Sequence, residues 1–270
     1  MTDGSPAPRL GVIGWPVAHS RSPAMHNAAL AAVGLPDWRY QLLPVPPELF
    51  EETVRALPAA GFRGVNVTIP HKEAALALSD TATDRATAIG AANTLVFAPT
   101  GEIRADNTDA PAIIDALPLA PSGRTALVLG AGGSARAAVW ALLNAGAKRV
   151  QVWNRTPARA QALAAELGAT AVADPEDAEI LVNCTSIGLD AAGEPFKQLP
   201  VLADGLSTYL CVVDLVYAEA ETRLVEAARG RGVPTVDGLT VLVGQGAFSF
   251  EQFTGRPAPV DVMRAAVAQR

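Results

Sequence analysis

The stretch that decides the fold is TALVLGAGGSARAA, residues 125–138. Its apolar start predicts a strand, and the alanine-rich residues after the glycines predict a helix. Between the two, Gly130, Gly132 and Ala135 meet the pattern G-x-G-x-x-A, which is typical of a dinucleotide-binding turn in this context. Gly130 permits the tight turn, Gly132 lets the backbone approach a pyrophosphate, and the helix amides face the anion. An ordinary strand-to-helix turn is the simpler alternative.

The end of the next expected strand favours NADP over NAD. An NAD site would place Asp or Glu about 20 residues after the glycines, on the ribose 2′-hydroxyl. The segment VWNRTPAR supplies Asn154, Arg155, Thr156 and Arg159 instead. The two arginines can pair with a 2′-phosphate, which a carboxylate would repel. The alternative is a helix capped by Thr156 whose two arginines are solvated.

On both sides of this stretch, strands and helices alternate along the chain, which predicts an α/β fold with largely parallel sheets. The expected strands are short apolar runs over residues 9–15, 38–45, 62–70, 125–129, 149–153, 179–186, 209–217 and 233–238. The expected helices are amphipathic runs over 22–34, 46–61, 71–79, 136–146, 156–168, 240–255 and 260–270. Residues 93–107 predict a hairpin that turns at 99–101. A proline-rich segment, 108–124, predicts a domain boundary near 106–122.

Composition excludes several classes of protein. At 270 residues, two domains are expected, and 50% hydrophobic with 18% charged residues argues against disorder. A net charge of -6 offers no basic surface for nucleic acid. No basic segment followed by an apolar one opens the chain, and no run of about 18 uncharged apolar residues occurs, so we expect neither signal peptide nor membrane span. Cys184 and Cys211 form no C-x-x-C, which favours a reducing compartment.

Candidate catalytic groups follow from the dinucleotide. Hydride transfer needs a proton donor and acceptor near the reacting oxygen. His19, His26 and His71 form no metal-binding pattern, so we expect no metal and regard each as structural more often than catalytic. Lys72 comes just after an expected strand, where α/β sheets keep their sites, and Asp109 follows another. The two could share a proton, although a solvated lysine at a helix start is the default interpretation.

Nine segments in order resemble the shikimate dehydrogenase family over nearly the whole chain, from about Leu10 into the last helix. These segments are GWPVAHSRSPAMHN, GVNVTIPHK, GAANTL, ADNTD, GAGGSARA, NRT, NCTSIG, DLVY and DGLTVLVGQGA. The resemblance implies a substrate-binding α/β domain with a mixed sheet over residues 1–108, onto which helices at about 246–270 pack back. It implies a Rossmann-type, doubly wound parallel-sheet domain for NADP over 109–245. The active site would lie in the cleft between the two.

The implied activity is the NADPH-dependent reversible reduction of 3-dehydroshikimate to shikimate, on the path to chorismate and the aromatic amino acids. The implied partner is a small-molecule substrate, with no metal, nucleic acid or membrane. A cytoplasmic monomer or homodimer is expected.

The resemblance also implies a role for each residue that matches a family motif. Lys72 matches the proton-transfer lysine, and Asp109 the aspartate beside the reacting end of the ring. The implied substrate-binding residues are Ser20, Ser22, Asn66, Thr68, Asn93, Tyr217 and Gln245. The implied cofactor-binding residues are Gly130, Ala131, Gly132, Gly133, Ser134, Asn154, Arg155, Thr156, Arg159, Leu215 and Gly238.

The serine pair in HSRSPAMHN would bind the substrate carboxylate. Ser20 and Ser22, two residues apart, can point the same way from an extended turn, and Arg21 would then point away. Ser22 is also the expected N-cap of the helix that follows. No nucleophile elbow and no metal partners surround the pair.

Three departures from the family pattern stand out: Ala110-Pro111 after NTD, Ala218-Glu219 after DLVY, and Val241. Two alternatives to the implied activity are a quinate or amino-shikimate dehydrogenase of the same superfamily and a non-catalytic NADP-binding regulator. The intact serine pair and arginine pair favour shikimate and NADP, and the presence of both Lys72 and Asp109 disfavours a regulator. A tetrahydrofolate-type dehydrogenase shares the two-domain plan but lacks the serine pair.

Overall fold

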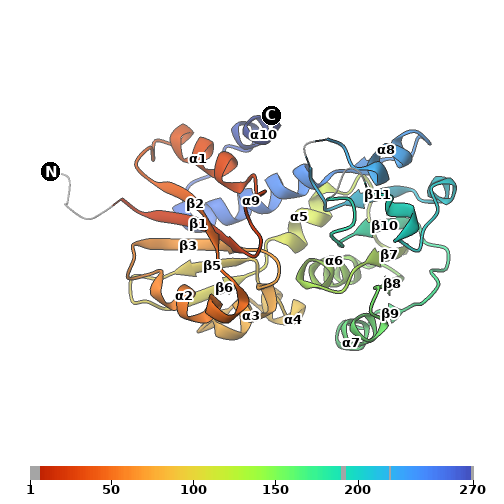
Figure 1. Cartoon of the computed structure of the whole chain (residues 1–270), viewed down its shortest axis with the longest axis horizontal. Coiled ribbons are helices and arrows are strands. Elements are labelled where there is room, and N and C mark those ends of the chain that lie inside the picture. Colours follow the sequence, from red (N-terminus) through yellow and green to blue (C-terminus); the bar gives the residue numbers. More distant parts are fainter. Residues whose placement is uncertain (1–6, 190–192, 219, 269–270) are drawn as a thin grey trace. The chain divides into compact units, whose positions relative to one another are not determined.

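The chain folds into two α/β units in the computed structural model, which describes residues 7–189, 193–218 and 220–268. Unit 1 comprises Met1–Thr108 and Val243–Arg270, and unit 2 comprises Asp109–Leu242. The chain therefore leaves unit 1, builds unit 2 without interruption, and returns. Figure 1 labels most of the elements of both units.

Unit 1 contains a mixed six-stranded sheet in the order β2-β1-β3-β5-β6-β4. Its strands are β1 (Arg9–Gly14), β2 (Arg39–Pro44), β3 (Phe62–Val67), β4 (Thr81–Ala82), β5 (Thr94–Phe97) and β6 (Ile103–Asp106). Its helices are α1 (Ser22–Ala32), α2 (Phe50–Ala56), α3 (Lys72–Leu78), α4 (Asp84–Ile89), the second part of α9 (Gly238–Thr254) and α10 (Val260–Ala268). β1 pairs in parallel with β2 and β3, whereas β5 runs antiparallel to β3 and β6.

This topology brings four strand ends to one edge of the sheet. Ile13 near the end of β1 lies opposite Val67 at the end of β3, because these strands are parallel. Thr94 opens β5 and pairs with both Asn66 and Asp106, because β5 is antiparallel to its two neighbours. The segments that follow β1, β3 and β6, and the segment that precedes β5, therefore share this edge. We call it the polar edge.

The last helices of the chain complete the core of unit 1. Met263 and Val267 of α10 are buried, and α10 packs against α1. Arg21, just before α1, donates a hydrogen bond to the carbonyl of Val267 at 2.7 Å. A Cβ at Gly246 of α9 would lie 2.2 Å from the terminal methyl of Met25, so these helices approach closely. Figure 1 shows α10 beside α1.

Unit 2 contains a six-stranded sheet that is parallel throughout, in the order β12-β11-β10-β7-β8-β9. Its strands are β7 (Thr125–Leu129), β8 (Arg149–Trp153), β9 (Thr170–Ala171), β10 (Ile180–Asn183), β11 (Cys211–Asp214) and β12 (Thr235–Val236). Its helices are α5 (Asp109–Ala116), α6 (Gly133–Asn144), α7 (Pro157–Leu167), α8 (Arg223–Arg229) and the first part of α9. The chain enters at the centre, builds outward on one side, and then builds on the other. This is the Rossmann order, which confirms the predicted fold class.

Several expected boundaries were wrong. Ser22 is not the N-cap of α1, because the helix begins at Ser22 itself and Arg21 occupies the cap position. The helix expected over 46–61 is a 3-10 turn at Pro47–Leu49 followed by the seven residues of α2. The late helix begins at Gly238 rather than at residue 240. Short elements were missed as well, namely β4, α4, α5, β9 and α8.

The prediction for α7 was better. Thr156 occupies the N-cap position, although its side chain makes no capping hydrogen bond, and Gly168 ends the helix in the left-handed region at φ 76°. The hairpin of β5 and β6 is confirmed. Within the described residues, no helix has both the length and the apolar character that crossing a bilayer requires.

Candidate active site

Asn66 and Asn93 form the centre of a buried hydrogen-bond network at the polar edge of unit 1. The carboxamide oxygen of Asn66 accepts from the Tyr40 hydroxyl at 2.8 Å and from the Ser249 hydroxyl at 3.3 Å. Its amide nitrogen donates to the carbonyl of Asn93 at 3.3 Å and to the Thr94 hydroxyl at 3.2 Å. Buried amides need such partners, and these four fix the orientation of the Asn66 side chain.

Asn93 links this network to α9. Its Oδ1 accepts from the backbone amide of Thr108 at 2.7 Å, and its Nδ2 donates to the Thr108 hydroxyl at 3.0 Å and to Oε1 of Gln245 at 3.3 Å. Both carboxamides are buried, with Asn93 at 2% and Gln245 at 8% exposure. The structure therefore brings together Asn66, Asn93 and Gln245, three of the residues predicted to bind substrate.

The segment that leads to Asp109 is held by a second cluster around Asp106. Arg85 donates to both carboxylate oxygens of Asp106, at 2.9 and 2.7 Å, and Thr83 and Gln252 donate at 2.7 Å each. Burial alone would raise the pKa of Asp106, but the hydrogen bonds from Thr83, Arg85 and the Asn107 amide, with the Arg85 charge, hold it below its ordinary value. Asp109, three residues on, is the first residue of α5 and belongs to unit 2. It is 8% exposed.

Lys72 is the first residue of α3 and is 8% exposed. Its carbonyl accepts from the amide of Ala92 at 2.8 Å, which joins the start of α3 to the segment before β5. His71, at the N-cap, stacks on Phe50 with ring centroids 4.3 Å apart and lies 2.7 Å from the carbonyl of Val45 through Nε2. His71 is therefore a structural residue that fixes where Lys72 begins its helix. Burial lowers the pKa of His71.

The serine pair comes between β1 and α1. Ser22 is buried and Ser20 half-buried, and the Ser22 amide donates to the Ser20 hydroxyl oxygen at 3.3 Å. The guanidinium of Arg21 is engaged with α10, as described above. Thr68, half-buried, follows β3 directly, and its carbonyl accepts from the amide of His71.

His26 is a residue whose place the sequence did not reveal. Its ring lies parallel to that of Tyr40, with centroids 4.2 Å apart and planes 1° from parallel, and neither ring nitrogen has a partner among the described residues. The ring is fully buried, which lowers its pKa to about 3. His26 therefore packs against the ring of Tyr40, whose hydroxyl donates to Asn66 of the polar edge. With its lowered pKa, the imidazole is neutral at neutral pH.

In unit 2, the turn between β7 and α6 has the geometry that a pyrophosphate needs. Gly130 has φ +111°, and a Cβ there would also lie 3.1 Å from the carbonyl oxygen of Cys184. A Cβ at Gly132 would meet no atom within 4 Å, so there is open space beside the start of the twelve-residue helix α6, where a ligand can approach the backbone. Gly132, Gly133 and Ser134 stand at this start, after Ala131.

The end of β8 lies at the same edge, because Leu129 of β7 pairs with Trp153. Asn154 donates to the carbonyl of Thr156 at 2.9 Å, which shapes the turn. Arg155 and Arg159 are exposed beyond it. Two exposed guanidinium groups without a carboxylate in residues 154–159 fit a ribose 2′-phosphate, so the residues present fit NADP.

Leu215, Tyr217 and Gly238 lie beyond the carboxyl ends of β11 and β12. A Cβ at Gly238 would fall 2.6 Å from the carbonyl oxygen of Val216 and 2.7 Å from that of Leu215, so only glycine fits at the start of α9. Tyr217 and Ala218 are half-buried. Of the departures from the family pattern, Glu219 lies outside the described residues, and Val241 is buried.

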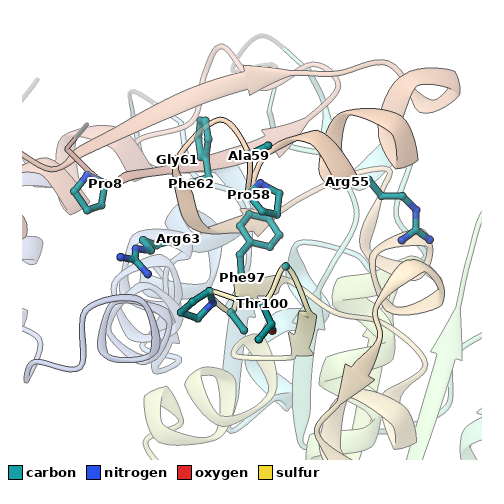
Figure 2. A pocket seen from close by; sticks show the side chains of 12 residues that line it. Pro8, Arg55, Pro58, Ala59, Gly61, Phe62, Arg63, Phe97 and Thr100 are labelled. Atoms are coloured by element: carbon teal, nitrogen blue, oxygen red, sulfur yellow. The ribbon is translucent and has the colours of Figure 1, made fainter. Parts of the chain in front are cut away.

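A pocket of about 610 Å³ lies elsewhere, at the opposite edge of the unit 1 sheet (Figure 2). It is lined by Phe62, which begins β3, and by Phe97, which ends β5. Arg55 at its rim is paired with Glu51. The pocket is therefore separate from the polar edge, and we assign it no function. No cluster of three or more metal-ligating side chains occurs among the residues that the structure describes.

Known proteins match the chain along most of its length. The family models match as follows: "Shikimate dehydrogenase substrate binding domain" over residues 12–95, "Shikimate / quinate 5-dehydrogenase" over 116–187, and "Shikimate 5'-dehydrogenase C-terminal domain" over 238–268. The shikimate dehydrogenase (NADP(+)) of Methylobacterium radiotolerans is 50% identical over 267 residues, covering 93% of each chain. The chain belongs to the shikimate dehydrogenase family.

Solved structures of this family share the fold. The shikimate 5-dehydrogenase of Thermus thermophilus, in complex with NADP(H) and shikimate, is 41% identical with a TM-score of 0.84, over 96% of this chain and 98% of that one. The quinate dehydrogenase of Corynebacterium glutamicum, in complex with NAD, is 31% identical with a TM-score of 0.83, over 97% and 99%. The family therefore includes shikimate enzymes that bind NADP and a quinate enzyme that binds NAD.

Proposed function

We propose that the chain catalyses the reversible, NADPH-dependent reduction of 3-dehydroshikimate to shikimate. The observation that carries this proposal is the polar edge of unit 1, where Asn66, Asn93 and Gln245 are joined in one network beside the start of α3. Polar side chains that are held in fixed positions suit a ligand rich in hydroxyl groups, because a hydroxyl group both donates and accepts hydrogen bonds. Membership of the family makes a shikimate-like ring the substrate of choice.

Lys72 and Asp109 are the catalytic residues in this proposal. Lys72, as an ammonium, donates a proton to the oxygen that becomes the C3 hydroxyl, and in the reverse direction neutral Lys72 accepts it. Asp109 hydrogen-bonds the reacting end of the ring and favours the charged lysine. The segment before Asp109 is held by Asp106 and Asn93, which limits its freedom.

The other substrate contacts divide by chemistry. Ser20 and Ser22 hold the carboxylate through hydroxyl donors. The hydroxyl groups of the ring fall to the remaining polar side chains, Asn66, Thr68, Asn93, Tyr217 and Gln245. The four partners of Asn66 use both of its amide hydrogens and both acceptor positions of its oxygen, so Asn66 reaches a ring hydroxyl only by exchanging one of them.

For the cofactor, we propose that residues 130–134 hold the pyrophosphate and that Asn154, Arg155, Thr156 and Arg159 hold the 2′-phosphate. Leu215 and Gly238 stand beside the nicotinamide. When bound, NADPH supplies the hydride. The helix amides and guanidinium groups of the chain orient it.

Initial rates of the purified protein test the proposal. Shikimate and quinate are each offered with NADP and with NAD, and the four values of kcat/KM are compared. We expect the pair of shikimate and NADP to give the largest kcat/KM. Turnover with none of the pairs would contradict catalysis and favour a binding protein.

Quinate or amino-shikimate dehydrogenation is the second candidate activity. The observation that favours it is the likeness to the quinate dehydrogenase described above. The arginine pair after β8 argues for NADP and so against an NAD-linked enzyme of that kind. A larger kcat/KM with quinate and NAD would establish this alternative.

The cellular setting stays a prediction. We propose a cytoplasmic enzyme of aromatic amino-acid biosynthesis that acts as a monomer or homodimer. Sedimentation of the purified protein at several concentrations distinguishes the two assembly states.

A further inference from the structure

Asp214 is a buried carboxylate of unit 2 that has no part in the reaction proposed above. It is the last residue of β11, and none of its surface is exposed. Its Oδ1 accepts from the side-chain amide of Asn183 at 2.9 Å and from the backbone amide of Val216 at 3.1 Å, and its Oδ2 accepts from the Thr222 hydroxyl at 2.6 Å. All three partners are donors, which fits an ionised carboxylate.

Each donor comes from a different segment of unit 2. Asn183 ends β10, and its Oδ1 accepts from the amide and the hydroxyl of Thr185 at 3.1 and 2.7 Å. Its Nδ2 also donates to the carbonyl of Ile187 at 3.2 Å, so Asn183 shapes residues 184–189, which we call the loop after β10. Thr222 is the N-cap of α8 and accepts from the amide of Val225. Asp214 therefore ties the loop after β10 to the start of α8.

A further segment depends on the same carboxylate. Val216, whose amide Asp214 accepts, contributes a carbonyl against which Gly238 packs. The start of α9 therefore rests on the backbone of Leu215 and Val216. These segments all lie at the carboxyl edge of the parallel sheet, where open α/β sheets bind their ligands.

We propose that ionised Asp214 is a positioning residue for the nicotinamide half of NADPH, acting through Leu215, Gly238 and the loop after β10. The inference rests on the proposed function, which places Leu215 and Gly238 beside the nicotinamide. Asp214 does not touch the ligand, because its atoms are fully covered. Burial raises its pKa to about 6, against the three hydrogen bonds, so the carboxylate is ionised at neutral pH.

Two ligands separate this role from general stability. NADPH contains the nicotinamide, whereas 2′-phospho-ADP-ribose keeps the pyrophosphate and 2′-phosphate but lacks it. In Asp214→Asn, the new amide presents hydrogens to donors. We expect its Kd for NADPH to rise about tenfold, as the loss of about 1.4 kcal/mol would give, while its Kd for 2′-phospho-ADP-ribose stays within about twofold. KM for NADPH should rise and kcat should fall, with KM for shikimate little changed.

Thr222 supplies the matched controls. Thr222→Ser keeps the hydroxyl, so its Kd for NADPH should equal that of the wild type. Thr222→Val removes the donor, so its Kd for NADPH should rise, but by less than in Asp214→Asn. If Asp214→Asn fails to fold, Thr222→Val carries the same ligand comparison. Equal weakening of both ligands, or no weakening of either, overturns the proposal. Wild-type turnover with shikimate tests the proposed function separately, because the ligand comparison needs binding alone.

Discussion

His26 shows how little of a residue's environment its sequence neighbours reveal. The sequence places it on a helix and makes a structural role more common than a catalytic one. Its parallel stacking on Tyr40 joins α1 to β2, and the Tyr40 hydroxyl then reaches Asn66 of β3. Such a chain of contacts depends on which strands are neighbours, and no local pattern specifies that.

Replacing His26 tests the cost of its burial. The pKa of His26 is about 3 in the folded protein and about 6.5 when unfolded, so its stability contribution is complete above pH 6.5 and is lost as pH falls towards 3. Between pH 7 and pH 4.5 this loss amounts to about 2.5 kcal/mol. From pH 7 to pH 4.5, the free energy of unfolding of His26→Phe should therefore fall by about that amount less than the free energy of unfolding of the wild type.

Urea unfolding at both pH values measures the difference. His19→Gln is the control, because the His19 side chain is exposed in the folded protein as well. An unchanged pH dependence in His26→Phe would show that His26 is not the buried neutral group described here.

Lys72 and Ser22 should respond differently to truncation, because one moves a proton and the other binds. Lys72→Ala should lower kcat by about 10²- to 10⁴-fold with a modest change in KM for shikimate. Ser22→Ala should raise that KM more than it lowers kcat. Steady-state rates for both variants give the comparison. Near-normal kcat in Lys72→Ala would remove the lysine from the proposed mechanism.

Helices and strands could be predicted wherever local chemistry decides their ends. α7 has a proline in its first turn and a glycine after its last, and its bounds fell where the sequence placed them. α2 did not, because the chain around Leu57 and Pro58 turns back to begin β3. β4, with two residues, exists only by pairing with β6, and a two-residue run carries no periodic signal.

Gly64, inside β3, is a position where close packing of its neighbours leaves no room for a side chain. A Cβ at Gly64 would lie 2.5 Å from the ring of Phe253 and 2.7 Å from the carbonyl of Leu95. We expect Gly64→Ala to lower the free energy of unfolding by about 1–3 kcal/mol through overpacking. Gly205→Ala, which would meet no atom within 4 Å, should change it by less than about 1 kcal/mol. Urea unfolding of both variants provides the test, and equal stabilities would contradict this packing.

At the scale of the whole molecule, the sequence indicated two domains and a boundary near 106–122, and the contacts change unit between Thr108 and Asp109. The parallel sheet of unit 2 followed from the alternation of strands and helices. The mixed sheet of unit 1 came from the family resemblance, because the order of its strands depends on pairings between distant segments. For the same reason the hydrogen-bond clusters around Asp106 and Asp214 could not be predicted.

Deleting residues 255–270 should destabilise unit 1 selectively. Met263 and Val267 would no longer cover α1, and two such side chains contribute roughly 3–6 kcal/mol. Thermal unfolding should show a lower transition for unit 1, while NADPH still raises the transition of unit 2. Arg21→Ala, which loses the bond to Val267, should cost only about 1 kcal/mol. A single unchanged transition in the truncated chain would contradict this role of α10.

Unit 1 is built from two segments that are separated in the sequence by the whole of unit 2, which affects how the protein folds during translation. The 134 residues of Asp109–Leu242 must be translated before α9 and α10 emerge, which takes roughly 7–27 s at about 5–20 residues per second. During this interval Met25 and the other residues of α1 that are buried in the complete protein are not yet covered by α9 and α10. The second unit of the chain can thus finish first, and the nascent first unit is the part in need of a chaperone's protection.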